Sequence, residues 1–423
     1  MPTLICTGAD VARSLWLETQ VSTNPPHARA VNAVSIAEID RRLRAIRSRM
    51  RERGVDALVL QNSSDWVGGY IRWFTNQPAT NGYPSSVVCP LEGGMSLIEQ
   101  GPFGGVRTAS DAEVKATAIA RRLTTPSYPS VHYTGTYDAD IAAAELRRLG
   151  ARRVGFVAPA AMYHSFGQHL RSTLAAANVD VVDFTDDVDR IKAIKSEEER
   201  ACIRQVAAMQ DEVMRRVAAY VRPGLRDFEI AAYAQYVGQQ LGSEQGIFLC
   251  SSAPQGQAAS FRPRSMQGRT LERGDVYSLL VENNGAGGFY TELSRIFVLG
   301  TPSQELQDVH AQVIEAQRFA LSLLKPGAAC AEIYARHNEY LQQQRLPTER
   351  RLSIHGMGYD MVERPLIRHD ETMQLEQHMA IVCHPSVLNE RMFVHNTDIY
   401  MIEAQGVSDC LHSTPKQIIQ IDG

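Results

Sequence analysis

Acidic and imidazole side chains gather in two segments of the C-terminal half, and each segment has the pattern of a β-hairpin. The first, residues 274–300, places Glu282 and Glu292 on either side of a glycine-rich turn. The second, about a hundred residues later, carries His384 and Asp398 where a matching pair would stand. Paired carboxylates on neighbouring strands bind divalent metals or divide acid and base roles between two groups. The sequence therefore predicts that the chemistry takes place between the two hairpins.

A repeated phrase indicates how these hairpins are positioned. Residues 222–233, RPGLRDFEIAAY, are similar to residues 325–336, KPGAACAEIYAR. Both segments consist of a basic residue, Pro and Gly, then four residues, then Glu-Ile. Each copy lies between two helical stretches and precedes a glycine-punctuated hairpin, so residues 196–423 read as helix, helix, hairpin, stated twice. Two such halves are expected to form one curved sheet backed by helices, with a cleft at the pseudo-two-fold axis.

The length and the hydrophobic pattern predict two domains. A chain of 423 residues exceeds what one hydrophobic core usually supports. Strands and helices alternate between residues 35 and 187, which predicts an α/β domain after an N-terminal arm at residues 1–34. The second domain, residues 188–423, is predicted to open with a long amphipathic helix that the capping box at Ser196 begins.

The composition narrows the class of protein. With 44% hydrophobic and 21% charged residues, the chain is an ordinary globular protein. Its net charge of -4 argues against nucleic acid as the main partner, so a small molecule or a peptide is the expected ligand. Seven scattered cysteines without a Cys-x-x-Cys motif predict reduced thiols in a cytoplasm. The sequence shows neither a signal-peptide pattern nor a run of about 18 apolar residues, so neither export nor membrane insertion is expected.

Three phrases resemble a known family. IKAIKSEEERACIRQ at the domain junction, GGFYTELSRIFVLG and HGMGYDMVERP, together with the duplication, are similar to the creatinase, prolidase and methionine aminopeptidase family over roughly residues 36–415. The resemblance implies an α/β N-terminal domain followed by an α+β pita-bread catalytic domain, and a homodimer. It also implies that the small domain lends residues across the dimer interface, for which the aromatic candidates are Trp66, Tyr70 and Trp73.

The resemblance also implies a set of site residues, because metal-dependent members hold two ions with two Asp, one His and two Glu. It places Glu292 on the second Asp, His355 on the His and His384 on the first Glu. The second Glu falls on Thr397, beside Asp398. Of these two neighbours, which point to opposite faces of a strand, Asp398 is the favoured pocket residue.

Other positions depart from the family pattern. Glu282 lies ten residues before Glu292 where the family spaces its Asp pair by eleven, so either Glu282 or Val281 takes the first place. Phe261 and Val362 stand where the family has two catalytic histidines. Two divalent ions require a bridging carboxylate and further acidic oxygens, so a dinuclear centre is not expected.

Two kinds of site remain open. One is metal-free, the case for which creatinase is the family precedent. There, His355 or His384 takes a proton from water while Glu282 and Glu292 hold the substrate nitrogen, and one of these carboxyls protonates it as it leaves. The other holds one divalent ion with the same four side chains.

We therefore expect a hydrolase that cleaves a C–N bond in a small amino-acid-derived, guanidino or amidino compound, without a favoured cofactor. A metal-dependent Xaa-Pro aminopeptidase or dipeptidase is the first alternative, and an inactive binding protein or a C–S lyase on the same fold is the second. The predicted substrate-binding residues combine the HGMGYDMVERP segment, the arginine-rich loop before the first hairpin and the second hairpin: Tyr359, Asp360, Glu363, Arg364, Phe261, Arg262, Arg264 and Asp398.

Overall fold

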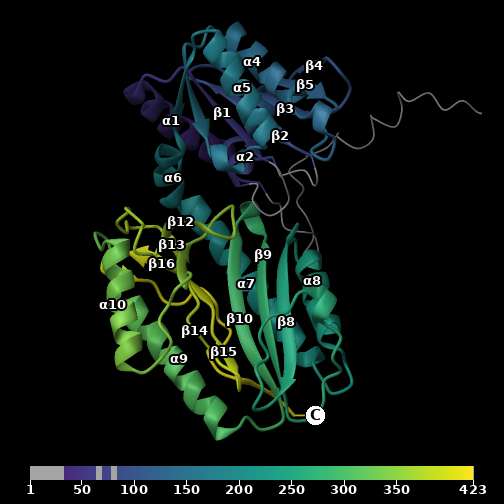
Figure 1. Ribbon diagram of the computed structural model, residues 1–423, viewed down its shortest axis with the longest axis vertical. Helices are drawn as coiled ribbons and strands as arrows, with labels where there is room; N and C mark the ends of the chain where they lie inside the picture. Colours follow the sequence, from purple (N-terminus) through teal and green to yellow (C-terminus); the bar gives the residue numbers. More distant parts are fainter. Residues whose placement is uncertain (1–32, 63–68, 78–82, 423) are drawn as a thin grey trace, which may run out of the picture.

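The computed structural model describes residues 33–62, 69–77 and 83–422. Nearly all of the predicted N-terminal arm, and Trp66, lie outside these residues. Figure 1 shows an N-terminal domain at the top of the view and a larger C-terminal domain below it. Within the described part, no helix is both long and apolar enough to span a bilayer. The cysteines of this part are all free thiols.

The N-terminal domain is built on a mixed sheet of seven strands in the order β4-β5-β3-β2-β1-β6-β7. Alternate residues of the central strand β1 pack on opposite faces: Leu58 and Leu60 enter one apolar cluster, and Ala57 and Val59 enter another. Helices cover both faces, which explains why the central strand β1 is apolar on both sides, whereas the edge strands β4 and β7 carry exposed charged residues. The strands are β1 (Ala57–Asn62), β2 (Ser85–Pro90), β3 (Met95–Gln100), β4 (Gly105–Thr108), β5 (Ile119–Thr125), β6 (Arg153–Val157) and β7 (Asp180–Asp183).

The helices of this domain follow the capping signals of the sequence. The first begins after Ser35, whose side chain accepts from the Glu38 amide, and ends at Gly54 in the left-handed region with φ 63°. The helices are α1 (Ile36–Arg53), α2 (Gly69–Thr75), α3 (Asp111–Thr117), α4 (Tyr137–Arg148), α5 (His164–Ala176) and α6 (Thr185–Ala193), with short 3-10 turns η1 (His132–Thr134) and η2 (Pro159–Ala161).

The C-terminal domain contains a four-stranded sheet, β18-β10-β9-β8, and a five-stranded sheet, β12-β11-β13-β16-β17. An isolated bridge between Ser294 and Thr397 joins them. The helices are α7 (Glu197–Tyr220), α8 (Asp227–Gln240), α9 (Gln304–Leu323) and α10 (Cys330–Gln343), with η3 (Arg264–Met266) and η4 (Ala286–Gly288). The strands are β8 (Gly246–Pro254), β9 (Asp275–Asn284), β10 (Tyr290–Leu299), β11 (Ile354–Gly356), β12 (Glu363–Leu366), β13 (Ala380–Cys383), β14 (Ser386–Leu388), β15 (Phe393–His395), β16 (Asp398–Glu403), β17 (Gly406–Val407) and β18 (Ile419–Ile421).

The duplication predicted from the sequence is visible in the backbone. The capping box at Ser196 opens α7, with the Ser196 side chain accepting from the Glu199 amide. The turn before α8 forms an isolated bridge from Arg226 to Thr270, and the turn before α10 forms the equivalent bridge from Ala329 to Gln374. Figure 1 shows the α7–α8 pair and the α9–α10 pair on opposite sides of the strands, as two related halves require.

Each sheet has one face against its own helices and one face toward the other half. Val281 and Leu293 of the hairpin pack with α7 and α8, so their neighbours Glu282 and Glu292 point to the opposite face. In the second sheet, Ile354 and its neighbours pack with α9 and α10. We call the faces that carry Glu282, Glu292 and His355 the inner faces of the C-terminal domain.

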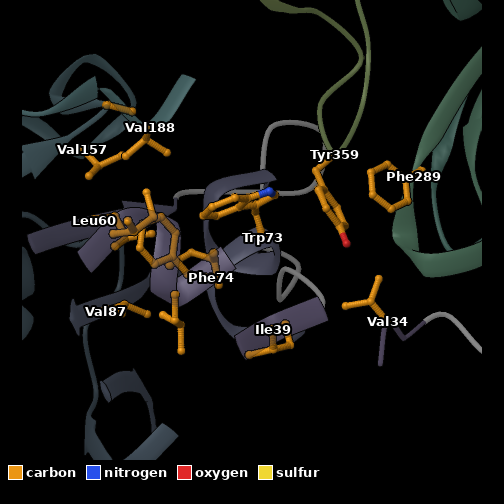
Figure 2. Packing of buried hydrophobic residues seen from close by; sticks show 14 of the residues in the cluster. Val34, Ile39, Leu60, Trp73, Phe74, Val87, Val157, Val188, Phe289 and Tyr359 are labelled. Carbon is orange, nitrogen blue, oxygen red and sulfur yellow. The ribbon is translucent and has the colours of Figure 1, made fainter. Parts of the chain in front are cut away.

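The contact between the domains is apolar as well as polar. Trp73 lies in a buried cluster that continues to Tyr359 and Phe289 of the C-terminal domain (Figure 2). Trp73 is 1% exposed, so it is a core residue rather than a partner contact. The Tyr70 hydroxyl donates to Asp189 at 2.5 Å, which ties this aromatic candidate to its own chain as well.

Candidate active site

Glu282 and Glu292 are direct partners across the β9–β10 hairpin. Directly opposed residues of an antiparallel pair point to the same face, so both carboxyl groups stand side by side on the inner face. The alternative position for the first acid, Val281, pairs with Leu293 and belongs to the apolar core under α7 and α8. The ten-residue spacing is therefore the natural register of this hairpin, and Glu282 is the residue that faces Glu292.

Burial makes these two carboxyl groups weak acids. Glu282 is 7% exposed and Glu292 is 5% exposed. Burial raises the pKa of Glu292 to about 8. Burial, and then the charge of Glu292, raise the pKa of Glu282 well above its ordinary value. Because two carboxylates so close cannot both ionise cheaply, the pair keeps at least one proton near neutral pH.

His355 brings a nitrogen to this pair from the other sheet. Its Nδ1 lies 2.9 Å from the Gly356 carbonyl oxygen, which fixes Nδ1 as the donor and leaves Nε2 with a lone pair. That Nε2 lies 3.7 Å from Oε2 of Glu292. Burial, followed by the neighbouring His384, lowers the pKa of His355 to about 3, so its ring is neutral.

His384 follows β13 and completes the group. Its ring centroid lies 5.1 Å from that of His355. Burial lowers the pKa of His384 to about 4, so this ring is neutral as well. One ligand atom each from Glu292, His355 and His384 falls within 4.8 Å of the others. The structure thus brings together Glu282, Glu292, His355 and His384 from three strands and one strand end.

A second polar group continues this surface below Glu292. Ser294 Oγ lies 2.7 Å from both Nδ1 of His395 and Oγ1 of Thr397. Nε2 of His395 is buried without a hydrogen-bond partner in the described part. Phe261 packs against this ring at 5.0 Å between centroids, so the predicted site residue Phe261 does lie beside the group. The sequence analysis did not identify Ser294 and His395. Ser294 lies two residues after Glu292 and His395 two residues before Thr397, and this spacing in a strand indicates a shared face.

The preference for Asp398 over Thr397 is wrong. Asp398 turns away from the inner face, where its Oδ1 accepts from Arg295 at 2.7 Å and its Oδ2 accepts from Asn396 at 2.6 Å. Burial opposes its ionisation, but hydrogen bonding from His412 and the charge of Arg295 hold the pKa of Asp398 below its ordinary value. Thr397 is the residue that reaches Ser294, so the strand faces are the reverse of the prediction.

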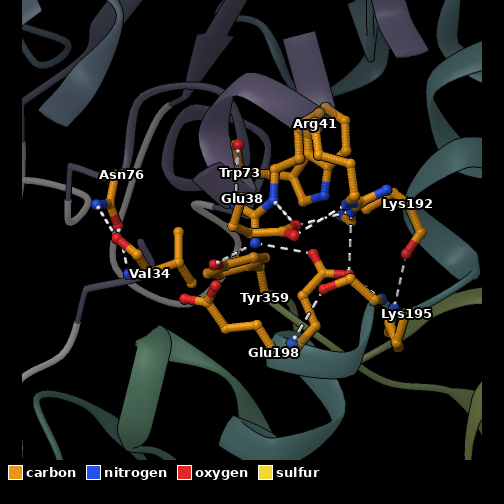
Figure 3. Close-up of polar contacts among 12 residues, drawn as sticks. Val34, Glu38, Arg41, Trp73, Asn76, Lys192, Lys195, Glu198 and Tyr359 are labelled. Atoms are coloured by element: carbon orange, nitrogen blue, oxygen red, sulfur yellow. Dashed lines mark hydrogen bonds and ion pairs between the residues drawn. The ribbon is translucent and has the colours of Figure 1, made fainter. Parts of the chain in front are cut away.

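The predicted substrate-binding residues Tyr359, Asp360 and Glu363 are also placed elsewhere. Lys192 forms ion pairs with Asp360 at 3.0 Å and with Glu363 at 2.9 Å. The Tyr359 hydroxyl oxygen accepts a hydrogen bond from the Arg42 guanidinium at 3.0 Å. Figure 3 shows Lys192 and Tyr359 within the same network of polar contacts at the domain junction. These residues join the two domains instead of lining the site.

Arginines predicted to bind the substrate do not reach it either. Arg364 pairs with Glu371 at 2.6 Å and with Asp186, both outside the site. Arg262 and Arg264 are exposed. The Arg262 amide donates to the Cys250 carbonyl, and the Arg264 guanidinium donates to Gln235 at 3.4 Å. A basic loop in solvent is the usual outcome for such a segment.

The donor set limits which metal centre these residues fit. Glu292, His355 and His384 supply one carboxylate and two imidazoles, a combination that suits a single divalent ion. Glu282 adds only a second carboxylate, and at the position of the family's second Glu, Thr397 is hydrogen-bonded to Ser294. The site therefore fits one ion but not a dinuclear centre.

Comparisons with known proteins agree with this architecture. Residues 201–408 match the model of metallopeptidase family M24. The chain is 25% identical over 403 residues to the uncharacterized hydrolase/peptidase y4tM of Sinorhizobium fredii, covering 92% of this chain and 98% of that protein. It is 27% identical over 223 residues to the Xaa-Pro dipeptidase of Pyrococcus furiosus, covering 50% of this chain and 61% of that protein.

Solved structures share the fold at low sequence identity. The X-Pro aminopeptidase of Thermotoga maritima superposes with a TM-score of 0.74 at 18% identity, over 90% of this chain and 99% of that one. Dipeptidase PepE of Mycobacterium ulcerans gives 0.72 at 20% identity, over 92% and 100%. These matches confirm the predicted α/β domain followed by a pita-bread domain, and the match to the metallopeptidase family supports the predicted hydrolase of C–N bonds. Residues 201–408 therefore belong to metallopeptidase family M24, and the chain as a whole is similar to Xaa-Pro peptidases.

Proposed function

We propose that this protein hydrolyses a C–N bond in a small amino-acid-derived compound, with its own side chains as acid and base. The observation that carries the proposal is the approach of Nε2 of His355 to Oε2 of Glu292 at 3.7 Å. A neutral imidazole and a carboxyl group whose pKa is about 8 are the two partners that acid–base hydrolysis requires.

The proposed steps balance within this pair. Water gives a proton to Nε2 of His355, and the water oxygen bonds to the carbon of the C–N bond. That bond breaks, and the nitrogen leaves with the proton of Glu292. The new carboxylate then stabilises the imidazolium 3.7 Å away, so the net charge of the buried site does not change. This coupling offsets the weak basicity of the isolated imidazole.

The other two groups have supporting roles in this proposal. Glu282, the cross-strand neighbour of Glu292, accepts hydrogen bonds from substrate nitrogen through its carboxyl oxygens. The ring of His384 lies against His355 and orients the attacking water.

The test is a screen of guanidino, amidino, N-acyl amino acid and dipeptide compounds for release of ammonia or amine. The matched variants are Glu292→Gln in the site and Glu305→Gln, an exposed glutamate paired with Arg391. We expect Glu292→Gln to lower kcat on the compound found by about 100-fold or more. Equal activity of the two variants would contradict the proposed acid.

A metal-dependent Xaa-Pro peptidase is the second candidate, since Glu292, His355 and His384 have their ligand atoms within 4.8 Å. These residues would hold one divalent ion, which polarises a carbonyl and lowers the pKa of bound water. Elemental analysis of the purified chain and assays with a chelator distinguish the two candidates. If turnover is lost when the metal is removed and returns when the metal is added back, the metal-free mechanism is excluded.

Cytoplasmic location and a homodimer complete the proposal. The scattered cysteines without a Cys-x-x-Cys motif support the first, and the resemblance to the family supports the second. Cell fractionation and light scattering of the purified chain test them directly.

A further inference from the structure

A cavity of about 200 Å³ lies between the α9–α10 pair, labelled in Figure 1, and the strand β14. Apolar and polar side chains share its walls, among them Val313 and Ala316 of α9, His337 and Leu341 of α10, residues 346–349 and residues 385–388. None of the described residues that line the cavity is one of the four acidic and imidazole groups of the candidate active site. The cavity is therefore separate from that site.

Hydrogen bonds to α10 hold one wall of the cavity, the segment 346–349, in place. The Glu349 amide donates to Oδ1 of Asn338 at 2.7 Å, and the Glu349 carbonyl accepts from Nδ2 of Asn338 at 3.3 Å. The Tyr334 hydroxyl donates to the same carbonyl at 2.8 Å. A wall that is fixed by the protein itself keeps its shape without a ligand, as is usual for binding sites of small molecules.

His337 brings an unpaired polar atom to this cavity. Its side chain lines the cavity and is 3% exposed, and its Nε2 is buried without a hydrogen-bond partner among the described residues. Burial lowers the pKa of His337 to about 4, and the charge of Glu349 opposes this only in part, so the ring is neutral. Because buried polar groups are almost always hydrogen-bonded, an unpaired nitrogen at a cavity wall indicates a partner from outside the chain.

The tautomer, the charge and the volume define the class of ligand. A neutral imidazole nitrogen is a donor or an acceptor depending on the tautomer, and a hydroxyl group pairs with either. The Glu349 carboxylate at the wall disfavours an anion. An apolar cavity of about 150 Å³ binds benzene, so a cavity of about 200 Å³ accommodates a molecule of about eight non-hydrogen atoms.

We infer that this cavity is a second ligand-binding site for a neutral compound that has an apolar body the size of a single ring and a hydroxyl group bonded to Nε2 of His337. Val313, Ala316 and Leu341 provide the apolar contacts. The inference goes beyond the proposed function and does not rest on it, because the lining of the cavity includes no group of the candidate active site.

Ligand-observed NMR titrations test the inference with benzyl alcohol and ethylbenzene, which are nearly equal in shape and differ in the hydroxyl group. The two compounds also differ in hydration, so the quantity to compare between proteins is the ratio of their dissociation constants, in which hydration cancels. His337→Phe keeps a ring but removes the nitrogen, and His337→Gln keeps a polar group. Ala316→Leu fills the cavity, and Ala311→Leu is its control at an exposed position of the same helix. Thermal unfolding confirms that each variant folds.

We expect the wild type to bind both compounds. The preference for benzyl alcohol over ethylbenzene should be about 5-fold lower in His337→Phe than in the wild type, because a buried hydrogen bond is lost. His337→Gln should keep part of the preference. Ala316→Leu should weaken the binding of both compounds by about 10-fold or more, because the added side chain occupies the space, whereas Ala311→Leu should bind as the wild type does. A wild type that binds neither compound, or a ratio that is unchanged in His337→Phe, overturns the inference.

Two further comparisons test the class of ligand and the place where it binds. Benzylamine or benzoate that binds more tightly than benzyl alcohol, and loses this binding in Ala316→Leu, overturns the assignment to a neutral hydroxyl compound. Glu292→Gln should bind benzyl alcohol as the wild type does, because Glu292 is not part of the cavity. A loss of binding in Glu292→Gln would place the compound in the candidate active site and overturn the second site.

Discussion

Glu282 and Glu292 face each other across the hairpin as buried cross-strand neighbours, 7% and 5% exposed. Two like charges in that position cost free energy unless a proton or a cation lies between them. The charge of Arg351 lowers the pKa of both carboxyl groups, but burial raises it by more. The folded protein therefore keeps these carboxyl groups protonated to a higher pH than the unfolded chain does, and its stability should depend on pH for this reason.

We predict that the wild type loses stability as the pH rises from about 6.5 to about 8. Glu292 has a pKa of about 8 in the folded state against 4.5 ordinarily. Its contribution to the free energy of unfolding is therefore complete below pH 4.5 and is lost as the pH rises to about 8. His355 and His384, with lowered pKa values, act in the opposite sense, but only below their ordinary value of 6.5. Between pH 6.5 and pH 8, the free energy of unfolding of the Glu292→Gln variant should fall by about 1–2 kcal/mol less than that of the wild type.

Urea denaturation at several pH values measures this slope, with Glu305→Gln as the control because that glutamate is exposed. An identical slope in wild type and Glu292→Gln would show that Glu292 is already ionised in the folded state.

The exchange of His355 for asparagine should lower kcat by about 100-fold or more on any substrate found, because Nε2 of His355 is the proposed proton acceptor. The matched control is His337→Asn, since His337 is also buried with a pKa lowered to about 4 by burial, but lines a separate cavity beside α10. Steady-state kinetics and thermal unfolding of both variants provide the measurement. Equal losses of kcat in both would point to a structural effect of removing a buried imidazole.

The exchange of Asp398 for asparagine should destabilise the protein by about 3–5 kcal/mol, because it leaves the Arg295 guanidinium buried without its charge partner. The side chains of Asp398 and Arg295 are 0% and 1% exposed and lie 2.7 Å apart. Asp370→Asn, which removes an exposed pair with Arg368, should leave the stability nearly unchanged. Chemical denaturation of the two variants decides; similar midpoints for both would refute the structural role of Asp398.

The exchange of Lys192 for methionine should weaken the junction between the domains, because Asp360 and Glu363 would lose their shared cation. A loss of about 3–5 kcal/mol is expected for breaking a buried pair. Differential scanning calorimetry should then show separate unfolding transitions for the two domains, whereas in the wild type the two domains should unfold closer together in temperature. Arg190→Met, which removes an exposed pair with Asp186, is the control and should leave the profile unchanged. A single unshifted transition in Lys192→Met would contradict this account.

Local signals predicted the secondary structure well, since helix caps and strand patterns depend on neighbours in the chain. Ser35 and Gly54 bound α1 as predicted, and Ser196 opens α7. The sequence left the first acidic place open between Glu282 and Val281, and only the register of the folded hairpin sets Glu282 opposite Glu292. Charged residues were harder to place, because a buried arginine or carboxylate is stabilised by partners that are distant in sequence.

The sequence by itself determined the duplicated halves, the paired glutamates and the histidines that could join them, because strand alternation and turns are local. Only the tertiary structure decided that Asp398 neutralises Arg295, that Asp360 and Glu363 hold the domains together, and that Thr397 reaches Ser294. Which partner a charge finds depends on how two sheets approach, and no spacing along the chain encodes that distance. For the same reason the sequence pointed to Arg262 and Arg264 before the hairpin, which the fold leaves exposed.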